Sequence, residues 1–352
     1  MTATHCATTS LRPRKILRRE AFGGMLVDMP SAKLSILDNS EYLRLRSRLA
    51  ASGGTSGEMR VVDVTTWGYP LLPDALSSPG SCYLELTKRC DGGCTHCYAE
   101  ATAKPRQNEL TFAEIERLLR QLAAGGAFCI RLTGGEPTLR QDLPDILEVI
   151  AGEGMRPELN THGWYGEAML NSLLERGVQD FRFSLDGTEP VNDTIRGRGS
   201  YQNVLATLHR ICEYNQRAAS PVEATINVVL MRANRPCVGA MTNLAAELGL
   251  KLSFGLLRPV GRALASEMLT PAEVADAAQE VTRRRRELGL TSGQVRINFD
   301  VFCDVHPHRP ANQFPLDGSK CPIGVNGIGV SADGRVMPCN FMESIDDGRW
   351  LG

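Results

Sequence analysis

Three cysteines on one short segment constrain this chain more than any other feature. Cys90, Cys94 and Cys97 form a C-x3-C-x2-C triad, which begins just after the apolar residues 83–86. Three thiolates on one loop can hold three corners of an iron–sulfur cube, and no fourth cysteine lies near them in the sequence, so one iron is left open to an outside ligand. A zinc site or chance clustering is the alternative, but zinc sites favour C-x2-C together with a second such pair. The spacing therefore favours a cluster with one open iron.

Length and composition are those of a soluble globular protein. The chain has 352 residues, 42% of them hydrophobic and 22% charged, which suits one large domain with appendages or two domains. A net charge of −1 gives no sign of a nucleic-acid or membrane partner, and no apolar run approaches the length of a membrane span. The first twenty residues lack a signal-peptide segment, so eleven cysteines predict cluster or thiol chemistry in a reducing cytoplasm.

From about residue 82 the pattern alternates between strand-like and helical segments. Thr111 and Thr270 each begin a capping box, and Pro271 stands at the first position of the second helix. Six strand–helix units in a row predict a parallel sheet that is closed, or partly closed, into a barrel. The predicted strands are 83–87, 128–132, 157–160, 180–184, 224–230 and 251–257.

Polar, glycine-rich or cysteine-bearing segments follow these predicted strands. The cysteine loop follows the first strand, residues 133–137 follow the second and residues 160–163 follow the third. Residues 184–187 follow the fourth strand and residues 257–262 follow the sixth. Because chemistry in parallel barrels gathers at the carboxyl ends of the strands, we expect these segments to converge around one mouth.

The residues ahead of this region predict a separate small unit. Residues 1–57 predict an α+β module with a hairpin and a helix over 41–51, and residues 58–81 predict a linker. The beginning of the chain is basic, which predicts a solvated arm, with contact to an acidic leader peptide as the alternative. These basic residues are Arg12, Arg14, Lys15, Arg18 and Arg19.

Taken together, these motifs resemble those of radical S-adenosylmethionine (SAM) enzymes, over a region from about Cys82 to Cys339. The resemblance implies an α/β fold, a partial (β/α)6 radical SAM barrel over residues 82–290, with the small N-terminal α+β module and a C-terminal cysteine-bearing β-hairpin extension. It implies a 4Fe-4S cluster on Cys90, Cys94 and Cys97, whose open iron chelates SAM. A one-electron reductant such as flavodoxin or ferredoxin would drive cleavage of SAM to methionine and a 5′-deoxyadenosyl radical.

The resemblance also implies which residues bind SAM. His96 precedes the third cysteine and is expected to pack on the adenine, a contact that Tyr98 could share. Residues 134–137 match the motif that holds the methionine amino group through backbone carbonyls and a glutamate, and its glycines allow close approach of the backbone. This motif consists of Gly134, Gly135, Glu136 and Pro137.

Three further residues match SAM contacts of the family. Asn160 and Ser184 match positions that contact the ribose or the carboxylate of SAM. Arg196 matches an arginine that pairs with the SAM carboxylate, a task that suits a guanidinium. The alternative for all three is helix capping and surface pairing.

The C-terminal residues 291–352 resemble the opening of a SPASM or twitch extension, which carries auxiliary iron–sulfur clusters. Cys321 and Cys339 stand in a C-x12-G-x4-C pattern, and a turn at residues 332–335 predicts a hairpin that brings them close. Further candidate ligands are Cys303, His306 and His308. The later cysteines of such extensions are absent, so we expect a truncated chain or an incomplete auxiliary site. A bare hairpin is the alternative.

Three segments are similar to peptide-maturing SPASM enzymes, in particular the mycofactocin and pyrroloquinoline-quinone maturases: residues 22–28, 192–201 and 257–262. In such enzymes a small module pairs the leader of a precursor peptide as an extra strand. The leading prediction is therefore a cytoplasmic radical SAM enzyme that modifies a ribosomally synthesised precursor peptide. The alternatives are a radical SAM enzyme acting on a tetrapyrrole or other small molecule, and a noncatalytic iron–sulfur electron-transfer or sensor protein. The Gly-Gly-Glu-Pro motif disfavours the noncatalytic iron–sulfur protein, because an electron carrier needs no motif that binds SAM.

Overall fold

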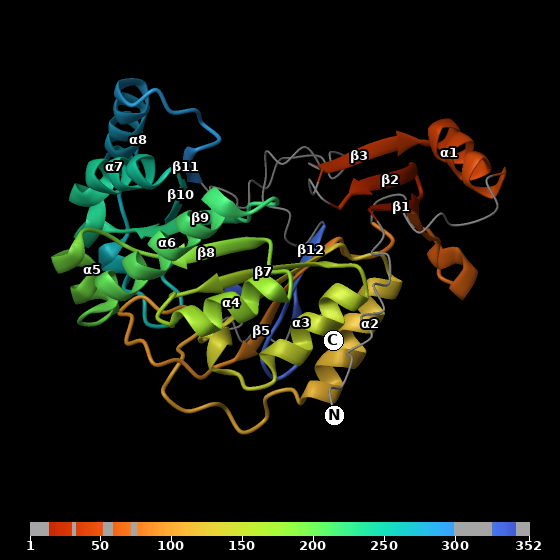
Figure 1. Cartoon of the computed structure of the whole chain (residues 1–352), viewed down its shortest axis with the longest axis horizontal. Coiled ribbons are helices and arrows are strands. Elements are labelled where there is room, and N and C mark those ends of the chain that lie inside the picture. The colour runs from red at the N-terminus through yellow and green to blue at the C-terminus, as the bar shows by residue number, and fades with distance from the viewer. Residues whose placement is uncertain (1–13, 30–32, 52–58, 72–75, 299–325, 343–352) are drawn as a thin grey trace.

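The structure is a computed structural model that describes residues 14–29, 33–51, 59–71, 76–298 and 326–342. Its strands form two sheets, one in the N-terminal module and one in the main body, which lie side by side (Figure 1). Within the described residues, no helix has the length and apolar character needed to cross a membrane.

The N-terminal module is a four-stranded sheet with the strand order β3-β2-β1-β4 and one helix. The predicted hairpin is present as β2 and β3, which are antiparallel, and the predicted helix is present as α1. Its elements are β1 (Lys15–Glu20), β2 (Gly23–Asp28), β3 (Lys33–Asp38), α1 (Asn39–Ala51) and β4 (Met59–Val62).

Two expectations about the ends of the module are wrong. Part of the predicted solvated arm is β1, in which Arg18 is buried and pairs with Glu20 at 2.6 Å. Part of the predicted linker is β4, which pairs parallel with β1, and its Arg60 donates to the backbone oxygens of Glu153 and Ala123 at 3.0 and 2.6 Å. A guanidinium suits these carbonyls because they stand at helix C-termini. Arg18, predicted to be solvated, is thus buried within the module, while Arg60 connects the module to two helices of the main body.

The main sheet has nine strands in the order β11-β10-β9-β8-β7-β6-β5-β12-β13. The neighbours from β11 to β12 are parallel, and β12 and β13 form an antiparallel hairpin. All six predicted strands are present, as β5 to β10. The strands are β5 (Ser81–Thr87), β6 (Cys129–Gly134), β7 (Arg156–Thr161), β8 (Asp180–Ser184), β9 (Glu223–Leu230), β10 (Lys251–Leu256), β11 (Val295–Asn298), β12 (Gly327–Val330) and β13 (Val336–Met337).

Helices alternate with the strands from β5 to β11, as the pattern predicts. The capping boxes at Thr111 and Thr270 are both formed, so the helices that follow them begin where the sequence indicates. The helices are α2 (Phe112–Ala124), α3 (Leu143–Gly152), α4 (Glu167–Glu175), α5 (Glu189–Arg196), α6 (Ser200–Arg217), α7 (Val238–Leu248) and α8 (Pro271–Glu287).

The two faces of the main sheet differ in polarity. On β8, Phe181 and Phe183 are fully buried in the core that the helices share, whereas Asp180, Arg182 and Ser184 point to the opposite face. The same alternation places Arg131, Glu158 and Thr225 on the polar face of the neighbouring strands. One face packed on helices and one polar face is what a partial barrel with a functional interior requires. The strand order is linear within the described residues, in agreement with a partial barrel.

The main sheet extends beyond the predicted barrel at both edges. β11 lies past residue 290 and pairs with β10, and β12 pairs with β5, so part of the C-terminal region belongs to the same sheet. The predicted hairpin at residues 332–335 is confirmed by the β12–β13 pair. Cys303, Cys321, His306 and His308 lie outside the described residues, so their proximity to Cys339 stays a prediction.

Candidate iron–sulfur and SAM site

The three cysteines of the triad lie on the loop after β5, and the backbone holds this loop from two sides. The Cys90 N–H donates to the Thr102 oxygen at 2.7 Å, and the Thr95 N–H donates to the Ile195 oxygen at 2.9 Å. A Cβ atom built on Gly92 would lie 3.4 Å from the Cys90 sulfur and 3.8 Å from the Cys94 sulfur. Both sulfurs therefore face one small space, and all three triad thiols are free.

Two arginines bring positive charge to the second cysteine. Arg196 Nη1 lies 3.6 Å from Cys94 Sγ, and Arg262 Nε donates to the Cys94 backbone oxygen at 3.0 Å. Burial raises the pKa of Cys90 to about 12 and also raises the pKa of Cys94, although Arg196 and Arg262 oppose the shift at Cys94. Iron binds the thiolate form, so positive charge beside the triad offsets the cost of burying an anionic cluster. The donor set and its surroundings fit a cluster with three thiolate ligands.

The Gly-Gly-Glu-Pro motif ends β6 and lies directly against the cysteine loop. Gly134 has a φ of +126°, and a Cβ on Gly135 would lie only 2.1 Å from the Arg89 oxygen, so neither position accepts a side chain. The Glu136 N–H donates to the same Arg89 oxygen at 2.8 Å. The glycines thus bring this motif against the residue that precedes Cys90.

The Glu136 carboxylate is buried and accepts hydrogen bonds from neighbouring loops. It accepts from the Thr138 N–H at 3.1 Å and hydroxyl at 2.7 Å, from the Thr161 hydroxyl at 2.9 Å and from the His162 N–H at 2.9 Å. With 1% of the residue exposed, Glu136 joins the end of β6 to the end of β7. The contact of Glu136 with the SAM amino group stays a prediction.

His96 and Arg196 meet at a residue that the sequence analysis missed. Asp186 is fully buried, and its Oδ2 lies 2.7 Å from Arg196 Nε and 3.4 Å from His96 Nε2. Burial lowers the pKa of His96 to about 4, so its imidazole is neutral near pH 7 and offers a flat, uncharged surface. For Arg196 the alternative of surface pairing is wrong, since its ion pair is internal. Its contact with a SAM carboxylate stays a prediction.

The remaining predicted residues lie on the polar face or beside it. Asn160 accepts from Arg131 Nη1 at 3.2 Å, and Ser184 ends β8 in register with Asn227. Tyr98 packs edge-on against Phe341, with ring centroids 4.9 Å apart, so the segment after β13 reaches the residue that follows the third cysteine. Whether these residues touch SAM stays a prediction.

Three residues of the candidate site were not predicted individually, although each lies in a segment that follows a predicted strand and that the sequence marks as polar or glycine-rich. They follow three different strands, and each is a charged or titratable residue among small or apolar neighbours. A charged or titratable residue at the end of a predicted strand is the sequence signal that could have identified them. The residues are His162 in 160–163, Asp186 in 184–187 and Arg262 in 257–262.

This chain resembles known proteins in sequence and in fold. The radical SAM superfamily model matches residues 84–235. Fe-coproporphyrin III synthase of Methanosarcina barkeri is 30% identical over 285 residues, which is 75% of this chain and 69% of that protein. PqqA peptide cyclase of Xanthomonas campestris is 31% identical over 274 residues, 76% of this chain and 69% of that protein.

Among solved structures, the fold is similar to that of Streptococcus suis SuiB bound to its precursor peptide SuiA. The TM-score is 0.72 at 15% identity, over 95% of this chain and 84% of that one. This likeness shows a shared fold, while the sequence relatives and the family model show the descent. The chain therefore belongs to the radical SAM superfamily of enzymes.

Proposed function

We propose that this radical SAM enzyme modifies a ribosomally synthesised precursor peptide. The N-terminal module binds the leader segment of that peptide. When bound, the cluster and SAM supply a 5′-deoxyadenosyl radical that abstracts hydrogen from the substrate, with an electron from a reductant such as flavodoxin or ferredoxin. The proposal rests on the N-terminal module (residues 14–71) and on its likeness to a peptide-bound structure. The likeness to SuiB, whose structure holds a precursor peptide, covers 95% of this chain and so includes most of the module.

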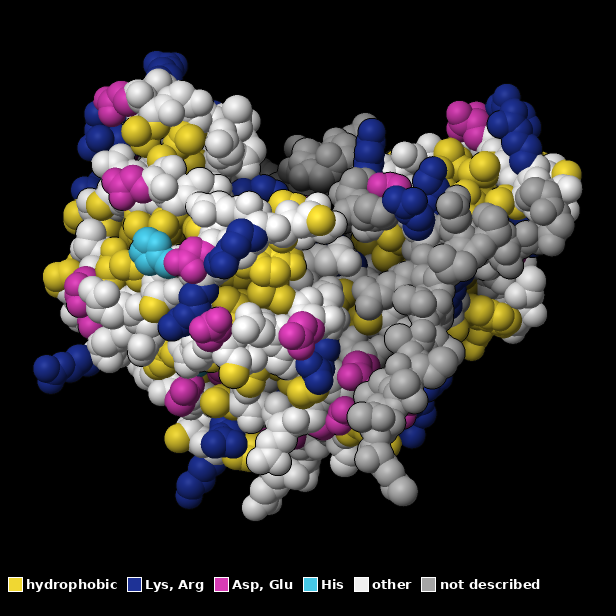
Figure 2. Space-filling view, in the orientation of Figure 1, with side chains coloured by type: hydrophobic (Ala, Val, Ile, Leu, Met, Phe, Trp, Pro, Cys, Tyr) yellow, Lys and Arg dark blue, Asp and Glu magenta, His cyan; other side chains and the backbone are white. Residues whose placement is uncertain are grey.

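The surface of the module supports a binding role. Eight large hydrophobic side chains are exposed among the described residues, and the module carries five of them although it is a small part of the chain. Apolar side chains gather on the side of the module seen in Figure 2. Large exposed apolar patches are typical of interaction sites, which supports a binding role for this surface. The five residues are Phe22, Ile36, Leu43, Trp67 and Tyr69.

The sheet of the module offers an edge for strand addition. Among the strands that the structure describes, β3 is the outer one in the order β3-β2-β1-β4, and Ile36 in its middle is 54% exposed. An extended peptide that adds to such an edge gains backbone hydrogen bonds, and its side chains give specificity. A leader bound at β3 would use the mode that the resemblance predicts.

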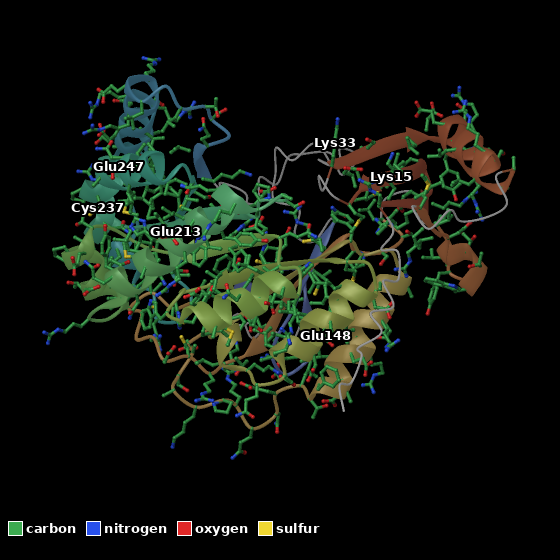
Figure 3. All side chains as sticks on the ribbon, in the orientation of Figure 1. Lys15, Lys33, Glu148, Glu213, Cys237 and Glu247 are labelled. Carbon is green, nitrogen blue, oxygen red and sulfur yellow. The ribbon has the colours of Figure 1, made fainter. Side chains whose placement is uncertain are left out.

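The charge of the module favours an acidic leader. Its described residues include nine Lys or Arg and five Asp or Glu, whereas the whole chain has 39 and 40. Lys15 and Lys33 lie at the same end of the sheet, since both are in register with Asp28 (Figure 3). Complementary charge speeds encounter and selects partners.

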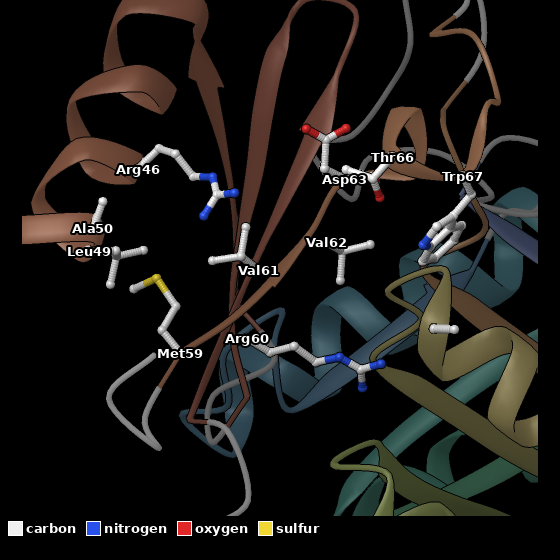
Figure 4. A pocket seen from close by; sticks show the side chains of 11 residues that line it. Arg46, Leu49, Ala50, Met59, Arg60, Val61, Val62, Asp63, Thr66 and Trp67 are labelled. Carbon is white, nitrogen blue, oxygen red and sulfur yellow. The ribbon is translucent and has the colours of Figure 1, made fainter. Parts of the chain in front are cut away.

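A pocket on the module suits an apolar side chain of the leader. It has a volume of about 500 Å³ and lies among α1, β4 and the short helix η1 (Val64–Trp67). Arg46 and Trp67 stand on opposite sides of it, with Val61 and Val62 between them (Figure 4). Trp and Arg are enriched among the residues that dominate binding energy at interfaces, and this pocket is lined by one of each.

Binding of a labelled precursor peptide, encoded by a short reading frame beside the gene, tests the proposal. Trp67→Ala and Arg46→Glu should each weaken binding by about tenfold or more, the effect of losing an interface anchor. Both should leave peptide-independent cleavage of SAM unchanged. Leu288→Ala removes another exposed hydrophobic side chain, at the residue that caps the C-terminus of α8, and serves as the matched control. Full affinity in the Trp67→Ala/Arg46→Glu double variant would contradict leader binding at this surface.

A tetrapyrrole is the second candidate substrate, because Fe-coproporphyrin III synthase is 30% identical. Titration with coproporphyrin III distinguishes the two candidates, since a bound porphyrin shifts its main absorbance band. A shift at micromolar concentration, with no binding of any neighbouring peptide, would favour the tetrapyrrole over the peptide.

A further inference from the structure

His162 connects three loops at the triad. Its Nε2 lies 2.7 Å from Asp91 Oδ1, and its backbone N–H donates to Glu136 at 2.9 Å. Asp91 follows Cys90 directly, Glu136 belongs to the motif after β6, and His162 itself follows β7. His162 is buried, and it joins the residue after Cys90 to the end of β7 through its imidazole and to the motif after β6 through its backbone N–H.

The hydrogen bonds of His162 specify its tautomer. The Trp164 backbone N–H donates to His162 Nδ1 at 3.0 Å, so this nitrogen is the acceptor and carries no proton. Nε2 therefore carries the proton and donates to the Asp91 carboxylate. Because Nδ1 is fixed by the backbone of its own loop, the imidazole cannot turn away from Asp91 without losing a second bond.

Trp164 adds an aromatic cover to this arrangement. Its ring stacks on His162, with centroids 4.3 Å apart and planes at 23°. A Cβ atom on Gly92 would lie 3.5 Å from Trp164 Cη2 and 3.4 Å from the Cys90 sulfur, so the indole edge and the thiol border the same small space.

We propose that His162 and Trp164 are positioning residues for the cluster. His162 holds the loop at Cys90 through Asp91, and Trp164 covers this side of the triad against solvent and oxygen. When a residue that orients metal ligands through hydrogen bonds is removed, the metal affinity commonly falls by tenfold or more. The proposal concerns the cluster alone and holds whether the substrate is a peptide or a tetrapyrrole.

The test measures cluster lifetime in anaerobically reconstituted protein, from the loss of cluster absorbance after admission of air. His162→Ala and Trp164→Ala should each shorten this lifetime by about tenfold. Trp164→Phe keeps a ring on the imidazole and should restore most of it. His209→Ala, which removes an exposed histidine from α6, should behave as the parent.

A second measurement separates positioning from general destabilisation. The Asp91 side chain is half exposed, so Asp91→Asn leaves the core intact. The substitution still weakens the hydrogen bond from His162 Nε2 to this side chain. It should change the EPR spectrum of the reduced cluster and shorten its lifetime, and the Asp91→Asn/His162→Ala double variant should be no worse than His162→Ala. Parent-like spectra and lifetimes in Asp91→Asn and Trp164→Ala would overturn the proposal. Additive losses in the double variant would also overturn it.

Discussion

Arg196 and Asp186 form a buried ion pair, with 2.7 Å between Nε and Oδ2, beside the second cysteine of the triad. A second nitrogen of the same guanidinium lies 3.6 Å from Cys94 Sγ. The pair also contacts His96, which the family resemblance places at the adenine of SAM. One internal carboxylate therefore orients two predicted SAM contacts and leaves one guanidinium nitrogen facing a cluster ligand.

We expect Arg196→Met to destabilise the protein by about 3–5 kcal/mol, because it leaves the Asp186 charge buried without its partner. Urea unfolding of the metal-free protein measures this change. Adding Asp186→Asn removes the orphaned charge and should recover part of the loss, which tests the pairing directly. Equal stability of Arg196→Met and the parent would mean that the pair is not formed in solution.

Alanine in place of Cys90, Cys94 or Cys97 should abolish reductive cleavage of SAM, since the cube loses a thiolate corner. Chromatographic detection of 5′-deoxyadenosine after addition of dithionite provides the measurement. The parent should carry about four irons per chain, and the triple variant should carry none. Cys212→Ala, in α6, is the control. A full cluster retained by the triple variant would instead indicate an auxiliary site that uses Cys339.

Glu136→Gln should weaken SAM binding to the cluster-loaded enzyme by about tenfold or more, since a hydrogen bond to a charged group contributes about 1.5–3 kcal/mol. The structure adds a second expectation. Four donors converge on this carboxylate, so Glu136→Ala should also lower the melting temperature, whereas Glu136→Gln keeps part of the network. Calorimetric titration and thermal unfolding separate the two effects. Unchanged SAM affinity in Glu136→Gln would leave Glu136 a purely structural residue.

His96 makes the stability of the metal-free protein depend on pH. Its folded pKa of about 4 lies below the value of about 6.5 for an unfolded histidine. The contribution is therefore complete above about pH 6.5 and is lost as the pH falls toward 4, by about 2 kcal/mol at pH 5. His96→Gln should flatten this dependence between pH 7 and pH 5 in urea unfolding. A slope identical to that of the parent would show that His96 titrates normally in the fold.

Features that depend on residues close together in the chain could be predicted without the structure. The spacing of Cys90, Cys94 and Cys97 predicts a three-thiolate site because one loop carries all three. The capping boxes at Thr111 and Thr270 place two helix starts, since a capping box closes within four residues. Alternating strand and helix patterns predicted six of the parallel strands, and polar strand ends predicted where the chemistry gathers.

Which distant residues meet at those strand ends depends on the packing of the whole chain and could not be predicted from local patterns. Arg196 reaches Cys94 across 102 positions and His162 reaches Asp91 across 71, distances that no local pattern encodes. The burial of Arg18 was equally hidden, because a basic residue reads as solvated until its partner Glu20 and the packing around both are known. β4, β11 and β12 are short, and their pairing depends on which sheet edge each one meets. Local spacing in the sequence therefore predicts the type of site, whereas the order of the strands determines which distant side chains contact its residues.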